Sequence, residues 1–132
     1  MNETRNVSTI KDIYAAFGRG DIPGIVERLA ADVTWRVHVD PVAPFSGAFD
    51  GKANVPRFFE TLGGAVDTQV FDPQEFVAQG DTVVSIGRYV CQGRASGKVS
   101  DGRWVFVWRF RPDGRIGSYE QFHTAGLADL FR

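Results

Sequence analysis

The sequence predicts a single α+β domain over residues 1–132, in which three N-terminal helices cover one face of a strongly curved, mainly antiparallel sheet. Two observations lead to this prediction. Apolar residues follow a helical spacing in the first half of the chain, whereas β-branched and aromatic residues alternate with a period of two in the second half. The composition, 43% hydrophobic and 13% aromatic, makes large rings the main source of buried area in one core.

Helical spacing predicts two helices at the start of the chain. The Gly-Arg-Gly sequence at residues 18–20 ends the first, and Asp21 caps the second, which has Pro23 in its first turn. The apolar stripe of the first helix consists of Val7, Ile10, Ile13, Tyr14 and Phe17. That of the second consists of Ile22, Ile25, Val26 and Leu29.

A strand and a third helix follow. Alternation over residues 33–39 predicts a half-buried strand with Trp35 on its inner side and His38 on its outer side. The third helix has Pro56 in its first turn and ends at the glycine pair 63–64. Its apolar side, which we expect to form a wall of a cavity, consists of Val55, Phe58, Phe59 and Leu62.

Four segments rich in Val, Phe, Tyr and Trp predict consecutive antiparallel strands, separated by turns around Gly80, Gly97 and Gly114. The segments are residues 69–78, 82–93, 102–111 and 115–123. A short tail helix follows, with Thr124 as its cap.

Bulky rings occupy one face of the third of these strands. The rings are those of Trp104, Phe106, Trp108 and Phe110. Four such rings are too wide to pack flatly beneath short helices, which favours a concave sheet around a pocket. The alternative is that they simply fill the core.

The charge balance argues against several classes of partner. Fifteen basic and 16 acidic residues give a net charge of −1, so we expect no nucleic-acid partner. Apolar runs stay below the ~18 residues of a membrane span, so we expect no membrane association. Cys91 is the only cysteine, which agrees with a reducing compartment and predicts a soluble cytoplasmic protein. The spacing of the two histidines and the lack of a phosphate-binding loop predict no metal and no cofactor.

Three stretches resemble a known family. The first consists of residues 13–17, the Gly20-Asp21 pair and residues 29–35. The second consists of residues 45–47, the Gly51-Lys52 pair and the Phe58-Phe59 pair, and the third of residues 110–116 and 119–125. In order and spacing they resemble the nuclear transport factor 2-like (NTF2-like) superfamily, in the SnoaL-like branch that also includes ketosteroid isomerases. The resemblance implies a cone-shaped fold, a deep pocket and a homodimer formed through the outer sheet face. It does not imply one reaction, because members include isomerases, cyclases, epoxide hydrolases, dehydratases and binding domains.

True ketosteroid isomerase activity is disfavoured. Those enzymes use a carboxylate base and an oxyanion hole made of a tyrosine and a protonated aspartic acid. Aligned on the Gly20-Asp21 pair, the tyrosine position holds Ile13, with Tyr14 turned by ~100° around the helix. Counted back from the Asp113-Gly114 turn, the acid position holds Phe106. One oxyanion donor is typically worth roughly 2.7–4 kcal/mol, so losing both would prevent efficient isomerisation.

His123, Asp40 and Tyr119 are the candidate catalytic residues. Tyr119, Gln121 and His123 share a face of the last strand, and the resemblance places that face inside. The imidazole of His123 can act as an acid or base near neutral pH or orient a carbonyl, and the alternative is a hydrogen-bonded histidine at the pocket rim. Asp40 resembles the base of the isomerases, although Val37 competes for that position and a turn-forming role is the alternative.

The candidate ligand-binding residues are mostly aromatic. They are Trp35, Phe58, Phe59, Tyr89, Trp104, Phe106, Trp108, Gln121 and His38. Hydroxyls of Tyr89 and Tyr119 suit a carbonyl or hydroxyl on a ring-shaped ligand, although both tyrosines also suit a core or an interface. His38 enters only if a bulge reverses the alternation before Asp40.

The leading hypothesis is a SnoaL-like protein that binds a small apolar oxygenated molecule. As an enzyme it would move a proton next to a carbonyl without a cofactor, as in isomerisation, aldol closure or dehydration. The alternative is a non-catalytic ligand-binding or dimerisation module. Epoxide hydrolysis ranks last, because strand parity turns Glu120 and Arg109 away from the ring-bearing face and leaves Asp101 without them.

Overall fold

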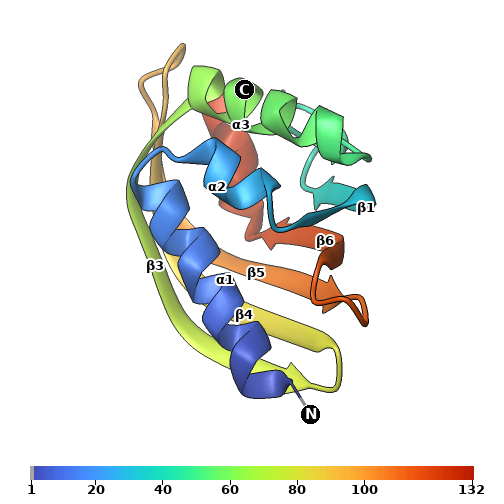
Figure 1. The fold of residues 1–132 in the computed structure, drawn as a ribbon. Coiled ribbons are helices and arrows are strands. Elements are labelled where there is room, and N and C mark those ends of the chain that lie inside the picture. The colour runs from blue at the N-terminus through green and yellow to red at the C-terminus, as the bar shows by residue number, and fades with distance from the viewer. Residues whose placement is uncertain (1) are drawn as a thin grey trace.

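The computed structural model describes residues 2–132, which form helices packed on the concave face of a curved six-stranded sheet (Figure 1). The three α-helices are α1 (Glu3–Gly18), α2 (Ile22–Val26) and α3 (Val55–Ala65). This arrangement confirms the predicted α+β fold class. Within the described residues, no helix combines the length and apolar character needed to cross a membrane.

The sheet has the order β2-β1-β6-β5-β4-β3. Its strands are β1 (Leu29–His38), β2 (Gly47–Ala48), β3 (Val66–Gln79), β4 (Thr82–Gly93), β5 (Val99–Phe110) and β6 (Ile116–His123). Two 3-10 helices, η1 (Lys52–Asn54) and η2 (Ala125–Phe131), precede α3 and follow β6. Strands β3 to β6 form the predicted antiparallel meander, and β1 joins β6 in a parallel pair that sets Trp35 opposite Tyr119.

Several element boundaries differ from the prediction. Leu29, expected on the second helix, begins β1, because α2 ends at Val26. The glycine pair 63–64 does not end α3, since neither glycine adopts a positive φ, and the helix continues to Ala65. The chain then enters β3 at once. The predicted tail helix is a 3-10 helix.

Bulges and a glycine shape the curved part of the sheet. The register between β3 and β4 shifts twice, and such bulges bend a strand and increase its twist. At Gly87 of β4 a side chain would collide with the sheet, because a Cβ there would lie 2.3 Å from Cζ2 of Trp104 and 2.5 Å from the carbonyl oxygen of Asp72. The glycine thus makes room for the Trp104 indole.

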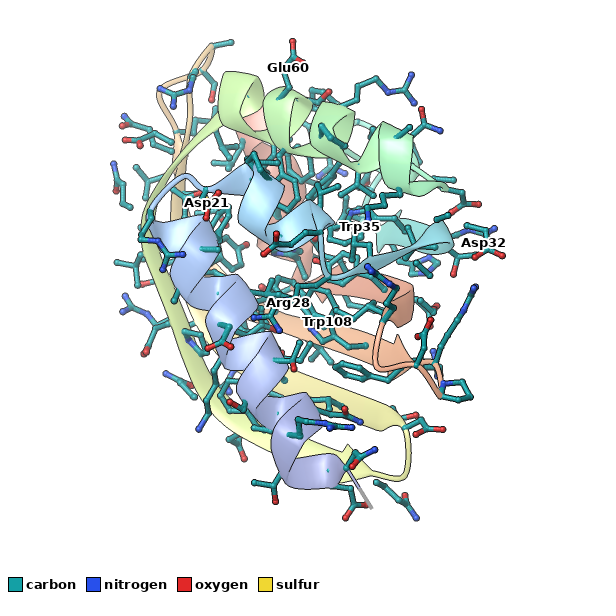
Figure 2. All side chains as sticks on the ribbon, in the orientation of Figure 1. Asp21, Arg28, Asp32, Trp35, Glu60 and Trp108 are labelled. Carbon is teal, nitrogen blue, oxygen red and sulfur yellow. The ribbon has the colours of Figure 1, made fainter. Side chains whose placement is uncertain are left out.

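The aromatic face of β5 points toward the helices, as the alternation predicts. Trp104, Phe106, Trp108 and Phe110 are all buried. Figure 2 shows Trp35 and Trp108 between the helices and the sheet, while Asp32 and Glu60 project outward. The core therefore lies on the concave side of the sheet.

Candidate functional site

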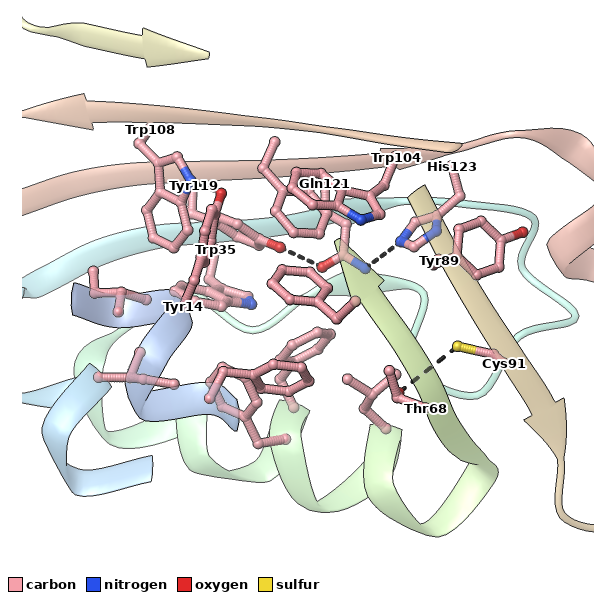
Figure 3. Close-up of a pocket in the computed structure, with 18 residues that line it drawn as sticks. Tyr14, Trp35, Thr68, Tyr89, Cys91, Trp104, Trp108, Tyr119, Gln121 and His123 are labelled. Atoms are coloured by element: carbon pink, nitrogen blue, oxygen red, sulfur yellow. Dashed lines mark hydrogen bonds between the residues drawn. The ribbon is translucent and has the colours of Figure 1, made fainter. Parts of the chain in front are cut away.

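A cavity of about 70 Å³ lies between the helices and the concave face of the sheet (Figure 3). Aromatic rings from α1, α3 and five strands form most of its wall. The volume is well below the ~300–1,000 Å³ of typical ligand pockets, because the rings occupy much of the space that the curved sheet encloses. In this state the protein holds a narrow apolar cavity rather than a wide pocket.

The polar groups of the cavity are uncharged side chains. Among residues 2–132, those that line it include no Asp, Glu, Lys or Arg. The polar residues in its wall are Tyr14, Thr68, Tyr89, Cys91, Tyr119, Gln121 and His123, together with the indole nitrogens of the tryptophans. A ligand in this cavity would therefore meet hydrogen-bonding groups in an apolar wall, with no fixed charge beside it.

Three side chains of β6 form a hydrogen-bonded chain along the wall. The hydroxyl of Tyr119 donates to Oε1 of Gln121, and Nε2 of Gln121 lies 2.7 Å from Nε2 of His123 (Figure 3). Residues two apart on a strand share a face, which is why the three side chains follow one another. The chain runs from the buried Tyr119 toward the half-buried His123.

Two buried nitrogens of this wall have no hydrogen-bond partner within the described residues. They are Nε1 of Trp35 and Nδ1 of His123. The indoles of the other two tryptophans are satisfied, since Trp104 donates to the carbonyl of Arg88 at 3.2 Å and Trp108 to the hydroxyl of Tyr14 at 3.0 Å. Unsatisfied buried polar groups are rare in native proteins, so both nitrogens require an explanation.

Burial sets the charge state of the ionisable groups. It lowers the pKa of His123 to about 4, so the imidazole is neutral at pH 7. It also raises the pKa of Tyr119 and of the Cys91 thiol, so both stay protonated. The site is thus a set of neutral donors and acceptors.

The buried Tyr14 also lines the cavity, a role that the helical spacing of α1 does not predict. Its hydroxyl contacts Ser85 of β4 in addition to Trp108, and burial raises its pKa. Ile13 and Tyr14 both line the cavity, because the curved sheet surrounds more of α1 than a flat one would. Thr68 and Cys91, whose polar atoms lie 3.7 Å apart, are further lining residues that no sequence signal identified.

Comparison with known proteins identifies a family with which this chain shares most of its length. A family model described as the SnoaL-like domain matches residues 10–119. The chain belongs to the SnoaL-like domain family. No curated protein sequence matches this SnoaL-like protein.

Solved structures of NTF2-like proteins resemble this SnoaL-like protein along nearly its whole length. One from Burkholderia xenovorans LB400 is 27% identical, with 100% of this chain and 99% of that chain covered and a TM-score of 0.89. One from Burkholderia thailandensis E264 is 28% identical, with coverage of 96% and 97% and a TM-score of 0.85. The crystal structure of TerC co-crystallized with polyporic acid is 26% identical, with coverage of 96% of each chain and a TM-score of 0.77.

Most of the predicted site residues of this SnoaL-like protein line the cavity. They are Trp35, Phe58, Phe59, Tyr89, Trp104, Phe106, Trp108, Tyr119, Gln121 and His123. Their roles remain hypotheses, but the structure brings them to one place. Phe106, at the acid position of ketosteroid isomerases, faces inward and offers no donor.

His38 and Asp40 do not line the cavity. His38 points to the outer face, where its Nε2 lies 3.0 Å from Oε1 of Glu120. Asp40 pairs with Arg132 at 3.0 Å and accepts a hydrogen bond from the backbone N–H of Val42, as a turn aspartate does. Both border a separate surface depression, which His123 also lines from its inner side. Burial alternates regularly from Val33 to His38, which accounts for the position of His38, and the register shift between β1 and β6 lies earlier, between Leu29 and Thr34.

The carboxylates of the SnoaL-like domain lie away from the cavity. Glu120 and Arg109 form an ion pair at 2.9 Å on the outer face, and Asp101 pairs with Arg88 at 2.8 Å on the same face. The water-activating set required for epoxide hydrolysis is therefore not assembled in the cavity. Within residues 2–132, no three His, Cys, Asp or Glu side chains lie close enough together to hold a metal ion.

Proposed function

We propose that this SnoaL-like protein binds a small, mainly apolar molecule that carries an oxygen acceptor, in the cavity between the helices and the sheet. The observation that carries the proposal is the pair of nitrogens that lack a partner among the described residues, Nε1 of Trp35 and Nδ1 of His123, in a wall made mostly of aromatic rings. The resemblance to TerC, which was crystallised with polyporic acid, supports ligand binding at 26% identity.

The energetics favour a ligand that meets these nitrogens. A buried donor without a partner costs about 1–3 kcal/mol, and a ligand oxygen placed beside it recovers that cost on binding. The rings supply the apolar contact, at roughly 25 cal/mol per Å² removed from water. A hydrocarbon without oxygen would gain only the second contribution.

Binding requires the cavity to widen. Phe17, Phe59 and Phe71 are half-buried and line both the cavity and the surface depressions beside it. Phe71 stacks on Trp104 with centroids 4.9 Å apart, so it closes the cavity on the β3 side. We propose that the ligand enters between these three rings, which rotate away from the cavity.

Proton transfer next to a carbonyl is a second candidate function, favoured by the chain of hydrogen bonds that ends at His123. The low pKa of His123, about 4, makes its imidazole a weak base at neutral pH, which is why binding is the leading proposal. In a screen of carbonyl substrates, His123→Ala should abolish any turnover that is found. Turnover that survives in this variant would exclude His123 from the mechanism.

Calorimetric titration tests the binding proposal with two probes, acetophenone, a small aromatic ketone, and polyporic acid. We expect the wild-type protein to bind at least one of them. Trp35→Phe removes an unpartnered N–H and should weaken binding about tenfold, the loss of one hydrogen bond. Trp104→Phe removes an N–H that is already bonded to Arg88 and is the matched control. Equal losses in the two variants, or no binding by the wild type, would contradict the proposal.

A further inference from the structure

The direction of the hydrogen bonds along β6 determines which nitrogen of His123 carries the proton. An amide oxygen can only accept and an amide nitrogen can only donate. Because Oε1 of Gln121 faces the hydroxyl of Tyr119, its Nε2 donates to Nε2 of His123. That ring nitrogen is then the acceptor, and the proton of the neutral imidazole lies on Nδ1.

The opposite orientation of the Gln121 amide would leave more groups unsatisfied. With the amide reversed, the hydroxyl proton of Tyr119 would have no acceptor and Nδ1 of His123 would become a bare, buried acceptor. In the observed orientation, Nδ1–H of His123 is the group that lacks a partner in the hydrogen-bonded series of Tyr119, Gln121 and His123, as far as the described residues show. Burial, which raises the pKa of Tyr119, keeps its hydroxyl proton in place over the working pH range.

Among the described residues, the rings next to His123 offer no second hydrogen bond to its ring nitrogens. Its neighbours in the cavity wall are the ring of Tyr89, whose centroid lies 5.0 Å away at an angle of 73°, and that of Phe106 at 6.1 Å. The Tyr89 hydroxyl is bonded to Ser100 at 2.8 Å instead. The hydrogen bond from Gln121 is therefore the polar contact that selects the tautomer.

We infer that Tyr119 and Gln121 are positioning residues that hold His123 as its Nδ1–H tautomer, so that the site selects ligands offering an acceptor over ligands offering a donor. The inferred ligand selectivity rests on the proposed function. The tautomer of His123 is a property of the protein without a ligand. The two statements can therefore be tested separately.

Nitrogen-15 NMR of the histidine rings tests the tautomer directly. The chain has only two histidines, and a His38→Gln variant assigns both sets of signals. We expect His123 to show a protonated Nδ1 and an unprotonated Nε2 at neutral pH. The Nε2–H tautomer in the wild-type protein would overturn the inference.

Substitutions in the chain should move the proton. In Gln121→Glu, a carboxylate accepts from Tyr119 and also from Nε2 of His123, so Nε2 should become protonated. In Tyr119→Phe, which preserves the ring, the amide is free to reverse and a mixture of tautomers is expected. Tyr89→Phe removes a hydroxyl next to the ring but outside the chain and should leave the Nδ1–H tautomer unchanged. A tautomer that is the same in all three variants would overturn the positioning roles.

The ligand arm uses acetophenone and 1-phenylethanol, which share a skeleton and differ in a carbonyl and a hydroxyl. Both probes offer an oxygen to Nδ1–H, but the wild-type protein should prefer the ketone, because the hydroxyl proton of the alcohol would be buried without an acceptor there. In Gln121→Glu the unprotonated Nδ1 can accept that proton, so the ratio of affinities should shift toward the alcohol by about tenfold. If Gln121→Glu switches the tautomer of His123 but leaves the ratio of the ketone and alcohol affinities unchanged, the inferred ligand selectivity is wrong. If neither probe binds at millimolar concentration, the proposed function fails, while the NMR result on the free protein still decides the positioning roles.

Discussion

The indole of Trp35 stacks on the ring of Tyr119, with centroids 3.9 Å apart and planes inclined by 28°. The contact follows from the parallel register of β1 and β6, in which the two residues face each other. It sets the unpartnered N–H of Trp35 beside the residue that begins the hydrogen-bonded chain to His123. The two nitrogens that lack a partner within the described residues thus lie on one wall, formed by two adjacent strands.

Acid should destabilise the protein through His123. The imidazole of His123 takes up a proton with a pKa of about 4 in the folded state and near 6.5 in the unfolded state. Between these pH values the unfolded state therefore binds more protons. The contribution of His123 to the free energy of unfolding should be constant above pH 6.5 and fall by up to ~3 kcal/mol as the pH drops to 4. Urea denaturation over this pH range measures the fall.

His123→Phe provides the comparison for this pH dependence. Removing the buried imidazole should flatten the profile between pH 6.5 and 4, and His38→Gln, which removes the histidine of the outer face, is the matched control. Hydrogen bonds from arginines lower the pKa values of Asp50, Asp101 and Glu120, so these carboxylates stabilise the fold above their ordinary pKa values and lose that contribution as the pH falls below them. An unchanged profile in His123→Phe would contradict the assignment.

Tyr14→Phe should destabilise the fold more than Ser85→Ala. The first change leaves the indole N–H of Trp108 without its acceptor and Ser85 without its partner, at an expected cost of about 1–3 kcal/mol. The second leaves Trp108 bonded to Tyr14. Chemical denaturation of both variants measures the difference, and a smaller loss in Tyr14→Phe would show that this network does not stabilise the core.

Gly87→Ala should destabilise the fold strongly for a single substitution in the sheet. The added methyl would lie 2.3 Å from the Trp104 ring and 2.5 Å from a backbone oxygen, and relieving such an overlap costs about 1–3 kcal/mol. Gly63→Ala is the matched control on a helix, where no atom lies within 4 Å of the new methyl, and it should stabilise the protein by roughly 0.5–1 kcal/mol. Melting temperatures of the two variants should therefore move in opposite directions.

The homodimer expected from the family resemblance stays a prediction. On the outer face Val105 lies between Ile86 and Phe122 of the neighbouring strands, and all three side chains are half-buried in the single chain. If two sheets pack through this face, Val105→Glu should convert a dimer into a monomer in light-scattering measurements. A wild-type protein that is monomeric at micromolar concentration would contradict the prediction.

Local patterns in the sequence predicted the parts of the fold that depend on local chemistry. The alternation along β5 placed the rings of Trp104 to Phe110 on one face, and Asp21 and the glycines at 18–20 marked the junction of α1 and α2. The parallel pairing of β1 with β6 could not be read from either strand, because it depends on long-range contacts. The glycine pair in α3 misled the prediction, since glycine permits a helix stop without requiring one.

The candidate site was predicted in part. Period two on β6 placed Tyr119, Gln121 and His123 on one face, which the structure brings to the cavity wall. The position of Tyr14 depends on how far the sheet wraps around α1, and the absence of a partner for Trp35 depends on its neighbours in three dimensions. Neither property has a signature in the order of residues along the chain.

A titration with acetophenone, followed in the indole region of a ¹H–¹⁵N NMR spectrum, measures whether the Trp35 N–H binds a ligand oxygen. The three tryptophans give three indole signals. Because Trp104 and Trp108 already have acceptors, a ligand oxygen should shift the Trp35 N–H strongly downfield and leave the other two nearly in place. Saturable binding that leaves the Trp35 signal unmoved, or moves all three signals alike, would show that the indole N–H of Trp35 does not bind the ligand oxygen.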